Sequence, residues 1–281
     1  IRYTHIQRKS PTSFAVYLED KAQETLFDDK VLGSLPLFKK VSSNPTEKGF
    51  QVIAGIEPET LVELKDDLVR KTMDTIRRRL VKSGVGQPSV VRKEEDRVVV
   101  RLPEPERGRS QVIELIKRPG LLEFRLVDDA GDLDAALQGK IPPETDLLYE
   151  VSVDPANGSL VRRPFLVKKR ALLTGELLRD ARARVDRIGH ASVTITFSEK
   201  GAKLFEKITG DHAGKRLAIV FDGRVFSAPV IKEKVSGGKA IIQGVFTRDQ
   251  AGRLALVLRA GPLPAPVRIL ETQTESGVSS K

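Results

Sequence analysis

Residues 214–231 read GKRLAIVFDGRVFSAPVI, and this stretch decides the fold of the second half of the chain. An apolar run at Leu217–Phe221 is followed by the pair Asp222-Gly223 and then by Val225-Phe226. Two strand-like runs on either side of Asp-Gly are the strongest local hairpin signal that a sequence can carry. The stretch therefore predicts two antiparallel strands joined by a tight turn. It contains no obvious nucleophile, metal-ligand set or phosphate loop.

Residues 254–270, LALVLRAGPLPAPVRIL, are the second informative stretch. The first half predicts a helix that ends near Gly261, because a glycine after the last turn and a proline one residue later stop a helix. A Pro-Ala-Pro spacer follows, and a last strand is expected at Val267–Leu270.

The longest predicted helix opens at Pro58, with acidic residues in its first turn, and ends at Ser83-Gly84. Side chains recur in it at steps of three and four residues, which predicts one buried stripe. The stripe consists of Leu61, Leu64, Leu68, Thr72, Ile76 and Leu80.

The remaining elements follow from local periodicity and turn residues. Strands are expected at 14–18, 36–42, 50–56, 89–92, 97–102, 121–127, 191–197 and 239–245, and helices at 20–32, 110–117, 198–209 and 248–260. Residues 128–165 are punctuated by Asp, Gly and Pro, which predicts a crossover between domains with local hairpin structure. The order β-α-β-β-α-β occurs twice, so the predicted class is α+β with two ferredoxin-like antiparallel-sheet domains.

The composition is that of a globular protein with a basic surface. Of the 281 residues 40% are hydrophobic and 31% charged, Cys is absent, and the formal net charge is +10. No apolar run approaches the ~18 to 20 residues that span a bilayer. The first residue is Ile1, without a start Met or signal peptide, so an excised soluble fragment is expected. The charge favours an acidic partner such as nucleic acid, lipid headgroups or acidic polypeptide, although a solvated basic surface explains it as well.

No residue pattern points to catalysis or to a metal. His5, His190 and His212 lie far apart without a second ligand at helix or hairpin spacing. Residues 210–216, GDHAGKR, resemble a phosphate loop only faintly, because three residues rather than four separate the glycines and an arginine stands where Ser or Thr should hold magnesium. We therefore predict no catalytic, cofactor-binding or metal-binding residue. An enzyme acting on an acidic small molecule has no residues to support it.

The triplet Arg77-Arg78-Arg79 raises the alternative of a basic nucleic-acid-binding ferredoxin-like module. Such modules stack bases on paired aromatic side chains of the central strands, and the predicted strand at 97–102 carries no aromatic residue. The triplet also falls on the long helix rather than on a sheet. A solvated helix face is the favoured interpretation of it.

Several blocks, taken together and in order, resemble the SecD family, whose members assist protein export through the bacterial Sec translocon. The blocks are TIRRRL (75–80) with GVGQP (84–88) and RVVVRLP (97–103), LLEFRLV (121–127), LLTG (172–175), 214–231 and 254–270. The first ~70 residues match the longer family members only in pattern. The chain departs from the family at Gln87, at Lys93-Glu94, at Pro262 and in the tail from Glu275 onward.

The resemblance implies the large periplasmic region of this family, in which a head is inserted into a base. Residues 1–128 and 265–281 would form the base, and residues 129–264 the head. The last strand would then belong to the base sheet. A hinge between the two parts is expected at two groups of residues: Asp128, Asp129 and Gly131, and Gly261, Pro262, Pro264 and Pro266.

The function implied is that of a non-enzymatic accessory of a membrane-bound translocase. By resemblance, the head captures unfolded preprotein on the periplasmic side of the bacterial inner membrane and helps its export, driven by the proton-motive force. The implied partners are SecF, the SecYEG translocon and the preprotein. No nucleic acid and no small-molecule substrate is expected.

Overall fold

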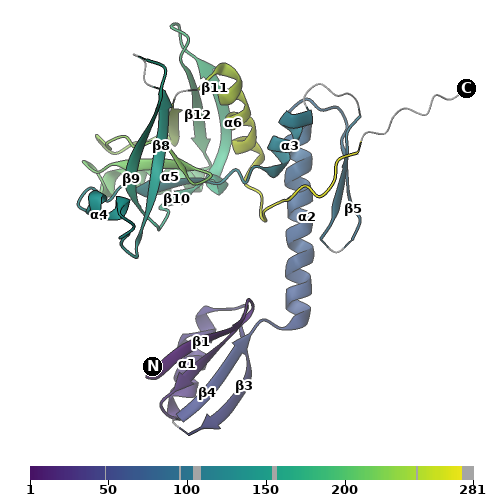
Figure 1. Cartoon of the computed structure of the whole chain (residues 1–281), viewed down its shortest axis with the longest axis vertical. Helices are drawn as coiled ribbons and strands as arrows, with labels where there is room; N and C mark the ends of the chain where they lie inside the picture. The colour runs from purple at the N-terminus through teal and green to yellow at the C-terminus, as the bar shows by residue number, and fades with distance from the viewer. Residues whose placement is uncertain (48, 95, 104–108, 154–156, 245, 274–281) are drawn as a thin grey trace, which may run out of the picture. The chain divides into compact units, whose positions relative to one another are not determined.

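The structure is a computed structural model of the chain, and it describes residues 1–47, 49–94, 96–103, 109–153, 157–244 and 246–273. The chain divides into two compact units, Ile1–Arg70 and Lys71–Lys281. Each unit is described by itself below, with the element labels of Figure 1.

The first unit is a four-stranded antiparallel sheet covered by one helix. Its strands are β1 (Tyr3–Ser10), β2 (Ser13–Leu18), β3 (Lys39–Thr46) and β4 (Gly49–Gly55), in the order β1-β2-β4-β3. The helix α1 (Ala22–Lys30) places Phe27 against Val16, Leu18 and Val52, and a short 3-10 turn follows at Leu32–Ser34. Alternation of apolar residues along β2 and β4 directs one face of the sheet toward this helix.

Helix α2 (Pro58–Lys82) crosses from one unit into the other. The predicted helix is confirmed, but the predicted buried stripe is correct only in its second half. Thr72, Ile76 and Leu80 are buried, whereas Leu64 and Leu68 are 37% and 39% exposed. The heptad-like spacing fixes which residues share a face, but not whether another element covers that face.

The second unit begins with a small helical part. The second half of α2 packs with the hairpin of β5 (Ser89–Arg92) and β6 (Val98–Arg101) and with α3 (Arg109–Lys117). Ile76, Leu80, Val90, Ile116 and Leu263 form the core, and Val267 and Ile269 pack against it. The predicted strand at 267–270 is wrong, because these residues lie in no strand. The segment still alternates: Pro264 and Pro266 are exposed, and Leu263, Val267 and Ile269 point toward the core. Because proline lacks the N–H that a strand ladder needs, the two prolines disfavour strand pairing here.

In the residues that the structure describes, the rest of the second unit contains two sheets and three helices. Figure 1 shows how these elements are arranged. The six-stranded sheet has the order β10-β7-β13-β14-β8-β9, with β7 (Leu122–Leu126), β8 (Thr145–Val153), β9 (Leu160–Lys168), β10 (Leu173–Thr174), β13 (Leu217–Phe221) and β14 (Arg224–Ser227). The three-stranded sheet has the order β11-β12-β15, with β11 (Leu178–Val185), β12 (Ala191–Phe197) and β15 (Lys239–Gln243). The helices are α4 (Leu133–Leu137), α5 (Glu199–Asp211) and α6 (Arg248–Ala260), and a 3-10 turn spans Gly175–Leu177.

The apolar run at Leu217–Phe221 forms strand β13, and its environment explains why the run has no polar residue. All five of its residues are buried. Leu217, Ile219 and Phe221 face the large core between the two sheets, and Ala218 and Val220 face a second, smaller core. A strand that is buried on both faces reads as a continuous hydrophobic run rather than as an alternation.

The smaller core exists because the six-stranded sheet curls back on itself. Val127, just after β7, pairs with Val167 of β9, and the Asp128 N–H donates to the Leu166 carbonyl at 2.8 Å. Five strands thereby close around Val127, Phe165, Val167, Ala218, Val220 and Val225. Closure satisfies part of the free edge of β9.

The predicted hairpin is confirmed: β13 and β14 are antiparallel and join at Asp222-Gly223. Both turn residues have positive φ, 49° and 76°, as a two-residue hairpin turn requires. The stop of α6 at Gly261 (φ 88°) and the capping box of Thr247 with Gln250 are also observed.

The α+β class is confirmed, but the pair of ferredoxin-like sheets is not. The predicted first copy, 49–127, is distributed over three sheets, because β4, β5-β6 and β7 each belong to a different one. A helix of 25 residues such as α2 is ~37 Å long and does not return the chain to the sheet that it left. In the predicted second copy, β12 and β15 share one sheet, while β13 and β14 lie in the other.

A substitution in the large core tests how far packing between the two sheets stabilises the second unit. Phe124 of β7 contacts Phe197 of β12 and Phe205 of α5, with ring centroids 5.7 and 5.9 Å apart. Phe124→Ala should lower the free energy of unfolding of the second unit by about 3–5 kcal/mol, because the cavity lies where three elements meet. Urea unfolding followed by circular dichroism measures it. Ile188→Ala, at an exposed turn, is the control and should change stability by less than about 0.5 kcal/mol.

Candidate functional site

The most unusual side chain in the second unit is Arg79 of α2, which is completely buried. It follows Thr72, Thr75 and Ile76 at helical steps of seven, four and three residues, so it lies on the buried face of α2. The favoured interpretation of the arginine triplet as a solvated helix face is therefore wrong for Arg79. Arg77 and Arg78 are exposed, but with Arg79 buried the triplet does not present three neighbouring cations to a nucleic acid.

The guanidinium of Arg79 ties together two chain segments that are distant in sequence. Nη1 donates to the carbonyl of Leu115 at 2.9 Å and to that of Arg118. Nη2 donates to the carbonyls of Pro119 and Gly261, each at 3.0 Å. Leu115 lies in the last turn of α3, Arg118 and Pro119 follow that helix, and Gly261 follows α6. Only arginine offers a planar fork of donors that can reach acceptors in both segments at once.

The two segments also bond to each other directly. The Leu263 N–H donates to the Pro119 carbonyl at 2.8 Å. The segment 118–121 leads from α3 into β7, and the segment 260–263 leads out of α6. We call this crossing, with Arg79 at its centre, the junction. We call the region from β7 to α6, which contains the six-stranded and three-stranded sheets, the two-sheet part. The chain enters and leaves it at the junction.

Burial lowers the pKa of Arg79 to about 10, because the charged guanidinium loses its hydration. The negative charge of Asp222 acts in the opposite direction, while Arg118 and Arg78 lower the pKa further. Arg79 remains charged at neutral pH, and the carbonyl dipoles replace the water that it loses. Its Nε has no acceptor within the described part of the chain.

Two more cations of α2 reach the end of α6. Arg78 Nε donates to the Ala260 carbonyl at 3.3 Å, and Lys82 Nζ donates to the Arg259 carbonyl at 2.9 Å. The last carbonyls of a helix carry partial negative charge and lack intrahelical partners. Side chains of α2 thus cap the C-terminus of α6. Burial lowers the pKa of Lys82, and the neighbouring Arg259 and Arg78 lower it further.

Gly120 is required at the junction for two reasons. Its φ is +78°, and a Cβ at this position would lie 2.6 Å from Arg79 Nη2 and 2.7 Å from Val257 Cγ1. The sequence marks Pro119-Gly120 as a helix stop, but the close approach of Arg79 depends on the fold.

The residues predicted as a hinge fall into two groups that the structure places differently. Asp128 pairs with Lys168 of β9 at 2.5 Å, Asp129 pairs with Arg216, and a Cβ on Gly131 would lie 2.8 Å from Leu166. These three residues bond or pack within the two-sheet part. Gly261 lies in the junction itself, and the prolines at 262, 264 and 266 continue from it.

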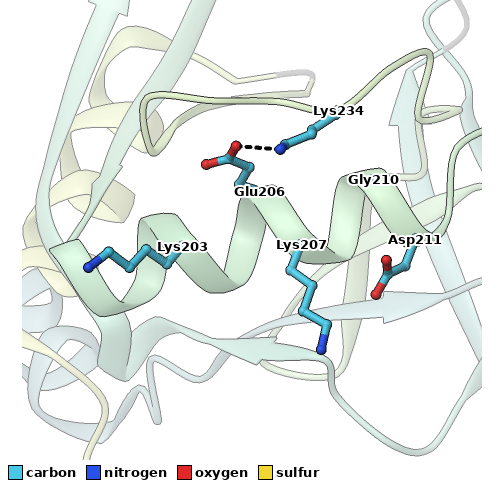
Figure 2. Close-up of a pocket in the computed structure, with 6 residues that line it drawn as sticks. All are labelled: Lys203, Glu206, Lys207, Gly210, Asp211 and Lys234. Atoms are coloured by element: carbon cyan, nitrogen blue, oxygen red, sulfur yellow. Dashed lines mark ion pairs between the residues drawn. The ribbon is translucent and has the colours of Figure 1, made fainter.

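A surface hollow lies along α5. Its volume is about 350 Å³, and it is lined by Lys203, Glu206, Lys207, Gly210, Asp211 and Lys234. Figure 2 shows Lys234 reaching Glu206, with which it forms an ion pair at 2.7 Å, while Lys203 extends toward the start of the helix and Lys207 points away from the ion pair. This ion pair lowers the pKa of Glu206. Residues 210–216 comprise the last two residues of α5 and the loop after it, and at a helix C-terminus the helix dipole repels phosphate.

Among the residues that the structure describes, no three His, Asp or Glu side chains gather as a metal site would require. In the same residues, no helix combines the length and apolar character needed to cross a membrane.

Sequence comparison reveals relatives of both parts of the second unit. The family model "SecDF, P1 head subdomain" matches residues 150–265, and "Protein translocase subunit SecDF, P1 domain, N-terminal" matches residues 69–129. SecD of Calditerrivibrio nitroreducens is 35% identical over 280 residues, which is 98% of this chain and 53% of the relative. SecD of Magnetococcus marinus is 41% identical over 216 residues, 76% of this chain and 40% of the relative.

Solved structures agree with these matches. A SecDF chain described as a membrane component that enhances protein export superposes with a TM-score of 0.59 at 32% identity, covering 85% of this chain and 98% of that one. SecDF in its super-membrane-facing form gives 0.58 at 32% identity, covering 83% of this chain and 29% of that one.

These likenesses define a class, the protein translocase subunits. The chain belongs to the SecD/SecDF family, and the matched residues correspond to its P1 domain. The chain spans about half the length of the curated relatives it matches.

Arg79 should matter far more to stability than its exposed neighbour. Arg79→Met leaves the carbonyls of Leu115, Arg118 and Gly261 without the donor that Arg79 supplies, while the Pro119 carbonyl keeps the Leu263 N–H. We expect the free energy of unfolding to fall by about 3–5 kcal/mol, because each buried acceptor left unpaired costs about 1–3 kcal/mol. Arg77→Met is the matched control, because this exposed arginine bonds to Asp74 and to the Val90 carbonyl, and a loss of about 1 kcal/mol or less is expected. Thermal and urea unfolding compare the two; equal losses would contradict the assignment.

A pair of glycine substitutions separates backbone strain from the close approach of Arg79 and Val257 to Gly120. Gly120→Ala and Gly84→Ala both place a Cβ at positive φ, +78° and +82°, but only the first meets atoms within 4 Å. Gly84→Ala should cost about 1 kcal/mol, and Gly120→Ala at least about 2 kcal/mol more. Equal losses of stability would show that the guanidinium does not pack against Gly120.

Proposed function

We propose that this chain is the periplasmic part of a Sec translocon accessory membrane protein, which captures translocating preproteins and helps their export driven by the proton-motive force. Membership of the SecD/SecDF family supports the accessory role. A structural relative described as enhancing protein export supports it further. We propose SecF, the SecYEG translocon and unfolded preprotein as partners, and the outer face of the bacterial inner membrane as the location.

The proposal includes a division into a base and an inserted head. The observation that carries it is the junction: the chain enters the two-sheet part at 118–121 and leaves it at 260–263, and both segments bond to Arg79. The match of the head family model to residues 150–265 agrees with this division. Because β7 belongs to the same sheet as β13, the structure favours a head that starts near Leu121 rather than at residue 129.

A connection made of two adjacent segments is suited to a hinge with restricted directions of swing. Gly261 has a left-handed φ that few residues adopt, and the prolines at 262, 264 and 266 stiffen the exit segment. We therefore propose that the head moves about the junction.

Site-specific photo-crosslinking in the full-length membrane protein tests the capture role. Crosslinkers in the head replace Leu160 or Ile188, whose side chains are 73% and 77% exposed, and the control replaces Val91 of β5 in the base. A translocating preprotein arrested in the channel should form adducts with the head positions several-fold more often than with Val91. If base positions reach the preprotein and head positions never do, the head is not the capturing part.

A further inference from the structure

A second charged contact spans the junction. It is longer and more exposed than the contacts of Arg79. Arg118 continues α3, since its N–H donates to the Glu114 carbonyl at 3.0 Å. Its Nε lies 3.8 Å from Asp222 Oδ2, and its guanidinium lies 5.8 Å from the ring centroid of Phe221. Arg118 therefore reaches from the helical part of the second unit to the β13–β14 turn of the two-sheet part.

Asp222 is held within the two-sheet part by hydrogen bonds to Leu121. Its N–H donates to the Leu121 carbonyl at 2.9 Å, and its Oδ1 accepts the Leu121 N–H at 2.8 Å. The other oxygen, Oδ2, is buried and accepts no hydrogen bond within the described residues. A buried carboxylate oxygen without a donor is unfavourable. The positive charge of Arg79 compensates it in part, and the charge of Arg118 adds to this while the two parts keep this orientation.

The two contacts differ in how easily they break. Arg79 is fully buried and donates to carbonyls of both connecting segments, so its release would leave a buried charge and several unpaired acceptors. The side chains of Arg118 and Asp222 are 44% and 18% exposed, and their separation is long for an ion pair. Water replaces such a contact readily, and a partly exposed pair biases an equilibrium by roughly two- to five-fold.

We propose that the junction is a two-part device: Arg79 is a permanent pivot, and the Arg118–Asp222 pair is a breakable latch that favours one orientation of the two-sheet part relative to α2 and α3. The inference rests on the proposed division into base and head but not on preprotein capture. In this proposal the β13–β14 turn does more than join two strands, because the contact of Asp222 with Arg118 depends on the position of α3.

Distance measurement between two spin labels tests the latch. The chain has no Cys, so cysteines introduced at Val81 of α2 and Lys203 of α5, both exposed, carry the only labels. A second pair, at Ile188 and Lys203, lies within the two-sheet part and reports its integrity. Asp222→Asn keeps the Oδ1 acceptor and removes the charge.

In Asp222→Asn the Val81–Lys203 distribution should broaden or gain a second distance, with the population of the original distance falling two- to five-fold relative to the alternative. The Ile188–Lys203 distribution should not change. Asp129→Asn is the matched control, because Asp129 pairs with Arg216 inside the two-sheet part, and it should leave the Val81–Lys203 distribution as it was.

A double-mutant cycle completes the test. Arg118→Gln should reproduce the effect of Asp222→Asn, and the combination should add nothing further, because either single change removes the same contact. The latch is overturned if the Val81–Lys203 distribution is unchanged in Asp222→Asn, if Asp129→Asn changes it equally, or if the two single effects simply add. Each of these results is independent of whether the head forms adducts with a preprotein.

Discussion

The second unit depends on one constraint: a fully buried guanidinium satisfies the ends of two helices at once. The cost of burying Arg79 is offset because its guanidinium donates to carbonyls at the end of α3 and after α6 that their own helices do not satisfy, although the Pro119 carbonyl also accepts the Leu263 N–H. The guanidinium supplies hydrogen-bond donors to the carbonyls, and the carbonyl dipoles stabilise its buried charge. It also fixes where the chain can enter and leave the two-sheet part. Gly120, the capping contacts of Arg78 and Lys82, and the bond from Leu263 to Pro119 all follow from that geometry.

Beyond the junction, the two-sheet part is organised around β13. This strand separates the large core from the small closed one, and its turn carries Asp222 back to the entry segment at Leu121. The same short sequence thus builds the core and contacts the junction. A part with its own cores that is attached through two adjacent segments is suited to move as a body, which is the motion proposed above for the head.

Local chemistry was sufficient to predict the elements that the sequence punctuates strongly. The Asp222-Gly223 hairpin and the stop at Gly261 depend on neighbouring residues alone. Strands β1 and β11 were missed because both are edge strands with charged residues on their open sides, and such strands lack a clear apolar alternation. Arg79 was misjudged because its acceptors lie 36 to 182 residues away, although its spacing from Thr72, Thr75 and Ile76 placed it on the buried face.

The central claim is that Arg79 holds the two connecting segments together, and native-state hydrogen exchange tests it most directly. The Leu263 amide is bonded to Pro119, and the amides of β13 report the core. Arg79→Lys keeps the charge, but a single ammonium cannot span both segments. The account predicts that the Leu263 amide loses its protection in this variant while the β13 amides keep theirs. An unchanged protection of Leu263 would contradict it.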